Sequence, residues 1–153
     1  MIRTFRKEDL EQISNLYFAL FTSLSKLEPD YIQPTFQKED FLDKIVNQED
    51  GFIGYLYEEN NIIKGFAIGQ MQTSAPYDCF VPLTNGYLMD IVVNEDYRGQ
   101  GIGKQLIETI KNWAKGNNAD YLELNVLAKN TKAFELYKKE DFEPYSISMR
   151  TKL

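Results

Sequence analysis

The chain has 153 residues, which is enough for one domain with a real core and too few for two. Hydrophobic residues make up 43% and charged residues 26%, as in ordinary globular proteins, and the net charge of −6 argues against nucleic-acid binding. Histidine is absent, which removes the usual general base and most catalytic zinc sites, so we expect no metal centre.

The lack of a recognisable targeting signal and the presence of a single cysteine predict a cytoplasmic protein. Charged residues stand near the N-terminus where a signal peptide needs an apolar core, and no apolar run approaches the length of a membrane span. The single cysteine, Cys79, excludes an internal disulfide and has no histidine or neighbouring cation to activate it, so we interpret it as a bystander thiol. The acidic surface favours cationic small molecules or only maintains solubility.

The first part of the chain predicts one strand and two helices. Residues 1–6 alternate enough to form a strand. Apolar residues then recur at steps of three and four, which predicts a long amphipathic helix: Leu10, Ile13, Tyr17, Leu20 and Leu24. Residues 36–46 predict a second, shorter helix after a loop that contains two prolines.

The middle of the chain predicts a hairpin and a long loop. The β-rich runs 52–57 and 62–71 are joined by Glu58-Glu59-Asn60-Asn61. These two asparagines tolerate the left-handed backbone that a tight hairpin turn requires. Residues 73–85 contain two prolines and several polar residues, and they predict a loop.

The last part of the chain alternates between strands and helices. A strand over 87–93 leads to a helix ending near Lys115, with one apolar face formed by Ile102, Leu106, Ile110 and Trp113. Residues 121–127 alternate as a strand, and Asn130-Thr131 predicts the cap of a helix that ends near Lys139. We expect residues 142–153 to form a final pair of strands.

The order of predicted elements is β-α-α-β-β-β-α-β-α-β(-β). It predicts one α/β (α+β) domain over residues 1–153, with a layer of mixed sheet and helices on both of its faces. No internal repeat, low-complexity tract or linker divides the chain.

The most informative segment is a glycine-rich turn, residues 98–104, between the strand at 87–93 and the following helix. The first N–H groups of a helix have no internal partner, and the helix dipole adds partial positive charge there. Glycine lets an anion approach the backbone closely, and Arg98 adds a fork-shaped cation. The turn therefore predicts a pyrophosphate site, although such a turn can also simply connect a strand to a helix.

The spacing of this glycine turn selects among nucleotide motifs. The dinucleotide-binding motif G-x-G-x-x-G does not match, because Lys104 stands where the third glycine would be. The Walker loop G-x-x-x-x-G-K-[ST] does not match either, because Arg98 replaces its first glycine and Gln105 its last residue. The pattern R-x-x-G-x-G, read from Arg98 to Gly103, resembles the acyl-CoA binding motif of the GNAT superfamily of N-acetyltransferases. The order of the elements is also the GNAT order, and the resemblance is strongest over residues 87–142.

The resemblance implies a GNAT fold, with a mixed and mostly antiparallel sheet of six to seven strands, splayed middle strands and about four helices. It implies acetyl-CoA as the cosubstrate and leaves a homodimer open. By the same resemblance, the residues expected to bind acetyl-CoA are Ile91, Val92, Val93, Arg98, Gly99, Gln100, Gly101, Ile102, Gly103, Lys104, Asn125, Asn130, Ala133 and Tyr137. Two departures are Glu95, where a proline is usual, and Asp141, where a glycine usually follows the last helix. Aspartate tolerates the left-handed conformation better than most residues, so we expect Asp141 to preserve the end of that helix.

Tyr137 and Asp90 are the candidate catalytic residues. The resemblance implies that Tyr137 is the general acid that protonates the departing thiolate. Asp90 interrupts an apolar strand, where an unpaired carboxylate is costly. It either faces the substrate amine as base or ammonium ligand, or pairs with a tyrosine or the backbone near a strand bend.

Further residues are candidates for binding the acceptor amine. Glu123 lies on the strand predicted at 121–127, opposite its apolar face, and is a second candidate carboxylate. The aromatic residues Tyr31, Tyr77 and Phe80 lie in predicted loops, where they are better placed as substrate walls than as core residues.

These residues predict a cytoplasmic acetyl-CoA-dependent N-acetyltransferase that acts directly on a primary amine of a small molecule or peptide. We expect no nucleic-acid or membrane partner. Two alternatives are a catalytically silent acyl-CoA-binding module and an acyltransferase with a longer acyl donor.

Overall fold

The computed structural model describes all residues of the chain, 1–153. The strands are β1 (Ile2–Thr4), β2 (Phe52–Glu59), β3 (Ile62–Thr73), β4 (Thr84–Val93) and β5 (Tyr121–Glu123), and the helices are α1 (Leu10–Leu27), α2 (Glu39–Val46), α3 (Ile102–Gly116) and α4 (Thr131–Lys139). Single-turn 3-10 helices precede α1, β2 and α3. No helix is both long and apolar enough to span a bilayer.

The strands form one mixed sheet in the order β1-β2-β3-β4-β5. All neighbours are antiparallel except β4 and β5, which are parallel. The predicted fold class is therefore confirmed, with four helices as expected. The expected count of six to seven strands is wrong, because residues 142–153, which were expected to form the last strands, form none.

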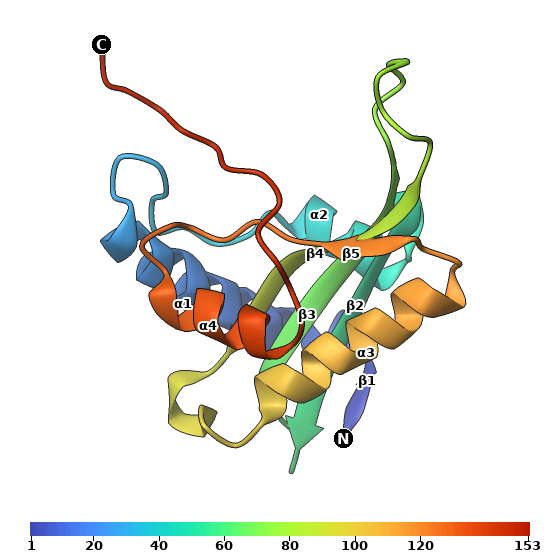
Figure 1. Cartoon of the computed structure of the whole chain (residues 1–153). Helices are drawn as coiled ribbons and strands as arrows, with labels where there is room; N and C mark the ends of the chain where they lie inside the picture. Colours follow the sequence, from blue (N-terminus) through green and yellow to red (C-terminus); the bar gives the residue numbers. More distant parts are fainter.

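Helices cover both faces of the sheet and create two apolar clusters (Figure 1). α1 and α2 pack on one face, where Tyr17, Leu56 and Phe66 are fully buried. α3 packs on the other face through Leu106 and Ile110, and α4 contributes partly buried side chains to the same cluster. The three- and four-residue spacing of apolar residues in α1 and α3 correctly predicted which face of each helix is buried.

Two turns contain the left-handed residues that the sequence predicted. Asn60 and Asn61, which join β2 to β3, have φ values of 54° and 61°. Asp141, which follows α4, has φ of 66°, so this aspartate ends the helix in the conformation usually taken by glycine. The loop between β3 and β4 spans residues 74–83, shorter than predicted because both strands extend into it.

A β-bulge interrupts the pairing of β3 with β4. Ile68 pairs with Asp90, whereas its neighbour Gly69 pairs with Leu88, so Met89 is the additional residue on β4. A bulge of this kind changes which face of the sheet the following side chains occupy, and bulges are frequent next to active sites. Here it places Asp90 on the α1 face, within reach of Tyr17.

Candidate functional site

The glycine turn, residues 98–104, presents a series of unpaired backbone donors. α3 begins at Ile102, and none of the N–H groups of residues 99–104 donates to another group of the protein. Gly99 and Gly101 have φ of 76° and 77°, values that favour glycine. A Cβ atom at either position would meet nothing within 4 Å. The turn is therefore open to a ligand, and its free amides lie at the positive end of the α3 dipole.

Arg98 stands beside these donors with most of its guanidinium free. Its Nε donates to the carbonyl oxygen of Val93 at 3.1 Å, which fixes the side chain against the end of β4. Arg98 forms no ion pair with a carboxylate of the chain, and the residue is exposed. Its terminal nitrogens can therefore bind phosphate oxygens in a bidentate arrangement.

Gly103 differs from the two glycines with positive φ. A Cβ atom there would lie 3.7 Å from Leu136 Cδ2 and 3.8 Å from Val93 Cγ2, at ordinary contact distance. The residue therefore faces Leu136 of α4 and the end of β4, and a methyl group would fit there without displacing either. The amide of Gly103 still belongs to the set of free donors.

Asp90 pairs with a tyrosine at the bulge of β4. The hydroxyl of Tyr17 donates to Asp90 Oδ2 at 2.7 Å, and Tyr17 is fully buried in α1. This is the pairing that the sequence analysis held open as a structural alternative, and it leaves Oδ1 without a hydrogen bond in the protein. Burial raises the pKa of Asp90, whereas the bond from Tyr17 lowers it, and the net shift is upward.

Tyr137 lies on α4 and is influenced electrostatically by Asp90. Burial, with a smaller effect from the charge of Asp90, raises the pKa of Tyr137 to about 12. Its ring packs edge-on against Phe142 at a centroid distance of 5.8 Å, which fixes its orientation. The charge of Asp90 therefore reaches Tyr137, although the two candidate catalytic residues come from opposite faces of the sheet.

Asn130 caps α4, as predicted. Its Oδ1 accepts a hydrogen bond from the N–H of Ala133 at 3.3 Å. The bond ties together two of the residues that the sequence analysis assigned to acetyl-CoA, and it leaves the Asn130 side-chain NH₂ free. Asn125 lies beyond the end of β5, and its Nδ2 donates to the hydroxyl of Tyr87 at 2.9 Å.

β4 and β5 separate soon after they meet. Their pairing covers only residues 85–87 of β4 and 121–123 of β5. The strand predicted over 121–127 is shorter in the structure and ends at Glu123. The residues after Glu123 form no strand pairing with β4. The part of β4 that contains Ile91, Val92 and Val93 pairs with β3 on one side only, so its other edge is free. These are the splayed strands that the sequence analysis expected.

Glu123 contributes a second carboxylate beside this splay. Its Oε1 accepts from the side-chain amide of Asn85 at 3.2 Å, and Asn85 is buried. Tyr145 lies close by, and partial burial together with the Glu123 carboxylate raises the pKa of Tyr145. Asn85 and Tyr17 are polar partners that sequence reasoning missed. No local pattern distinguishes either from an ordinary strand or core residue.

The predicted aromatic walls lie apart from Asp90 and Tyr137. Tyr77 and Phe80 are exposed in the 74–83 loop, which projects from the far end of β3 and β4 (Figure 1). They line a hollow of about 510 Å³ with neighbouring loop residues. From Thr84 to Asp90, β4 spans roughly 20 Å at about 3.3 Å per residue. Only an extended acceptor could contact both Asp90 and the aromatic side chains of the 74–83 loop. Tyr31 is also exposed, with Arg150 over its ring at 5.3 Å.

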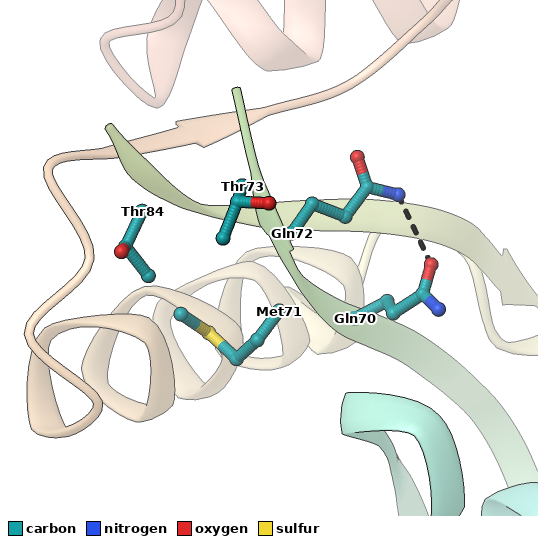
Figure 2. Close-up of a pocket in the computed structure, with 5 residues that line it drawn as sticks. All are labelled: Gln70, Met71, Gln72, Thr73 and Thr84. Atoms are coloured by element: carbon teal, nitrogen blue, oxygen red, sulfur yellow. Dashed lines mark hydrogen bonds between the residues drawn. The ribbon is translucent and has the colours of Figure 1, made fainter. Parts of the chain in front are cut away.

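A second hollow, of about 470 Å³, lies next to this loop (Figure 2). It is lined by the last residues of β3 and the first of β4: Gln70, Met71, Gln72, Thr73 and Thr84. Gln72 Nε2 donates to Gln70 Oε1, on the same strand, at 3.0 Å. It contains none of the predicted site residues, so we place the candidate site at the glycine turn and the splay.

Comparison with known proteins identifies relatives of this chain. The model of the "Acetyltransferase (GNAT) family" matches residues 10–142. The uncharacterized N-acetyltransferase YobR of Bacillus subtilis is 43% identical over 68 residues, which cover 43% of this chain and 28% of YobR. The chain thus spans less than a third of that relative.

Solved structures show the same fold. A mutant of the BH1408 protein from Bacillus halodurans superposes with a TM-score of 0.93 at 22% identity, over 100% of this chain and 99% of that one. The aminoglycoside N-acetyltransferase AAC(6')-Iy, solved in complex with CoA, gives a TM-score of 0.74 at 20% identity, with 100% of both chains covered.

Proposed function

We propose that this chain, which belongs to the acetyltransferase (GNAT) family, transfers an acetyl group from acetyl-CoA directly to a primary amine of a small molecule or peptide. The observation that carries the proposal is the glycine turn, where the backbone donors of residues 99–104 are free at the start of α3. AAC(6')-Iy, which shares the fold, was solved with CoA bound, and this supports acetyl-CoA as the cosubstrate.

The cosubstrate is proposed to bind along the open side of β4. The turn amides and Arg98 hold the pyrophosphate, and Asn130 and Ala133 lie beside the pantetheine arm. The free edge of β4 at residues 91–93 offers backbone groups to the pantetheine amides, as a sheet edge does to an extended peptide. The N–H of Ile91 or Val92 is the proposed donor to the oxygen that becomes negative during attack.

Asp90 is the proposed base. The neutral amine nitrogen forms a bond to the thioester carbon, the carbon–sulfur bond breaks, and the thiolate departs. The nitrogen must lose a proton, and Asp90 Oδ1, which has no partner in the protein, can accept it directly or through water. Because burial raises the pKa of Asp90, this carboxylate is a stronger base than one in water. Glu123 is the second candidate for this role.

Tyr137 is proposed to donate to the departing sulfur. Its pKa of about 12 keeps the phenol protonated at all physiological pH values. That pKa lies well above the ~8.5 of an ordinary thiol, so complete transfer of the phenol proton to a free thiolate is uphill. The phenol therefore stabilises the leaving thiolate mainly through a hydrogen bond, and the net proton comes from the amine.

The acceptor is proposed to be cationic in its resting form. Asp90, Glu123 and the net charge of −6 all favour an ammonium-bearing substrate. The aminoglycoside acetyltransferase with this fold acts on such a compound by its name. We also propose a cytoplasmic location, in keeping with the single cysteine, and a homodimer.

Release of free thiol from acyl-CoA tests the activity. Acetyl-CoA is mixed in turn with polyamines, aminoglycosides, amino acids and peptides, and we expect turnover with at least one amine. Binding of CoA without thiol release from any donor would identify the silent module. Faster release from longer acyl donors would identify the alternative acyltransferase.

Two glycine variants, a test and its control, examine the proposed CoA site by calorimetry. Gly101→Val places a branched side chain where φ is 77° and where the ligand must approach, so CoA binding is expected to be lost while the domain stays folded. Gly116→Val is the matched control at the other end of α3, where a Cβ also meets nothing within 4 Å. Unchanged CoA affinity in folded Gly101→Val would contradict the assignment of the turn.

A further inference from the structure

Lys64 is the only charged residue of β3, and it lies in an otherwise apolar part of that strand. Its side chain is only 11% exposed. Lysine is rarely covered to this extent unless its ammonium group has a partner, because the charge loses hydration. The residue takes no part in the proposed acetyl transfer, so its position needs another reason.

A second β-bulge places Lys64. Tyr57 of β2 pairs with Gly65, whereas the next residue, Glu58, pairs with Ile63, so Lys64 is the additional residue on β3. Ile63 is buried in the apolar cluster on the α1 face. A bulge redirects the side chain of the additional residue and is frequent near functional sites. The strand therefore departs from regular pairing at the position of its one charged side chain.

The contacts of Lys64 join β3 to the segment that follows β4. Its Nζ forms an ion pair with Glu59 and lies 4.5 Å from the centroid of the Tyr97 ring. Tyr97 packs against the apolar cluster on the α3 face, so the ammonium group lies on the side of the sheet where α3 begins. The carbonyl oxygen of Lys64 accepts from the N–H of Asn94 at 2.8 Å. One residue thus holds both ends of the segment 94–97.

This segment supports the glycine turn from its N-terminal side. Tyr97 directly precedes Arg98, so the position of Tyr97 determines where the guanidinium group and the turn begin. On the other side of the turn, Ile102 is 3% exposed and fixes the start of α3. Gly99 and Gly101 do not restrict the backbone between these points. The turn therefore keeps its shape only as far as the residues on either side of it are held.

We infer that Lys64 is a positioning residue for the proposed CoA site: it holds Tyr97, and through Tyr97 it fixes Arg98 and the glycine turn in the arrangement that binds the diphosphate. The inference rests on the proposed function, because it concerns the same site. A turn that is fixed before the ligand arrives binds it more tightly, since less ordering accompanies binding. The ammonium group itself is directed to Glu59 and the Tyr97 ring, so Lys64 acts on the ligand through its neighbours.

Calorimetry with CoA tests the inference on the full chain. Lys64→Ala is expected to weaken CoA binding roughly tenfold, because Tyr97 loses the cation over its ring. Lys64→Arg should retain most of the affinity, since a guanidinium group also stacks on an aromatic ring. Lys44→Ala is the matched control: it breaks the ion pair of Lys44 with Asp50, at 2.8 Å beside α2, and should bind CoA as the parent does. Far-UV circular dichroism checks that each variant is folded.

A truncated donor separates positioning of the turn from general stability. S-acetylpantetheine carries the same thioester as acetyl-CoA and has no diphosphate. For Lys64→Ala, the KM for acetyl-CoA should rise roughly tenfold with kcat nearly unchanged, and kcat/KM for S-acetylpantetheine should equal that of the parent. A merely structural role would lower activity with both donors alike.

A proline at position 95 tests whether Lys64 acts by ordering the segment. Glu95 is the first residue of the 3-10 turn Glu95–Tyr97, and its N–H donates to no group of the protein. Asn94 has φ of −52° and ψ of 133°, the extended backbone that the residue before a proline adopts. Glu95→Pro should therefore stiffen the segment and restore CoA affinity in Lys64→Ala by roughly threefold. Glu95→Gln removes the same charge without stiffening the backbone, and it should restore less.

The outcomes distinguish this inference from the proposed function. A parent protein that binds no CoA would refute the proposed CoA site and the inference together. If the parent binds CoA, three results would each overturn the inference alone: parent affinity in folded Lys64→Ala, equal losses with both donors, or no greater recovery with Glu95→Pro than with Glu95→Gln.

Discussion

Asp90→Asn tests the core of the proposed mechanism, because stability and activity should change in opposite directions. In the parent, the ionised carboxylate is largely buried, and its pKa is raised in spite of the hydrogen bond from Tyr17. The burial cost of the charge therefore exceeds the contribution of that bond. Asparagine keeps an oxygen that accepts from Tyr17 and removes the buried charge.

The magnitude follows from linkage between protonation and folding. Each unit by which a folded-state pKa exceeds the unfolded value costs about 1.4 kcal/mol of stability at pH values above both. For a carboxyl group with a raised pKa, the folded state binds the proton more tightly, so stability falls as pH rises from about 4 through the folded pKa. We expect Asp90→Asn to be more stable than the parent at pH 7, on the order of 1 kcal/mol or 2–4 °C in Tm. The difference should be clearly smaller at pH 4 and should vanish at pH values well below the unfolded pKa of about 3.9.

Urea unfolding at pH 4 and pH 7, together with pH–rate curves, measures both halves of the prediction. Loss of a general base is expected to lower kcat/KM at pH 7 by roughly 10²–10⁴-fold. Activity should partly recover at high pH, where the amine arrives already neutral. A variant that is less stable at pH 7 but turns over at the parent rate would refute the reasoning and leave Asp90 as a structural partner of Tyr17.

Two further variants address the neighbours of Asp90. Tyr137→Phe should lower kcat by roughly 10²-fold or more, because the phenol acts on the leaving sulfur, and it should leave the affinity for CoA nearly intact. Turnover at the parent rate with the same substrates would assign that role to water or another group. Tyr17→Phe should cost about 2 kcal/mol of unfolding free energy at pH 7, since it leaves a buried carboxylate oxygen without its donor. That cost should be smaller at pH 4, because the lost bond favours the ionised form of Asp90; an equal cost at both pH values would show that Asp90 does not titrate in this range.

The sequence predicted the parts of the fold that local physics determines. The spacing of apolar residues in α1 and α3 identified their buried faces, because a helix repeats every 3.6 residues whatever its neighbours are. Asn60, Asn61 and Asp141 were assigned to left-handed positions because their side chains tolerate positive φ. The glycine turn was recognisable because its chemistry lies in consecutive residues.

Features that depend on pairing between distant segments could not be read in this way. The bulge at Met89 is a property of the register between β3 and β4, and a run of apolar residues contains no signal for it. The bond from Tyr17 to Asp90 joins residues 73 positions apart. The alternation of apolar and polar residues in the tail predicted strands there, and the structure has none after α4, because alternation alone does not supply a pairing partner.

The shortness of β5 connects the failed strand prediction to the proposed site. The alternation over residues 121–127 would allow a ladder along the whole edge of β4, yet pairing stops at residues 87 and 123. Had it continued, hydrogen bonds to β5 would occupy the backbone groups of residues 91–93 and cover the edge between the two faces of the sheet. Because it stops, this edge stays uncovered, and the charge of Asp90 on the α1 face contributes, after burial, to the raised pKa of Tyr137 on α4. A local preference for strand is overridden at the edge where the proposed site lies, and functional sites are where such departures from sequence-level expectation are expected.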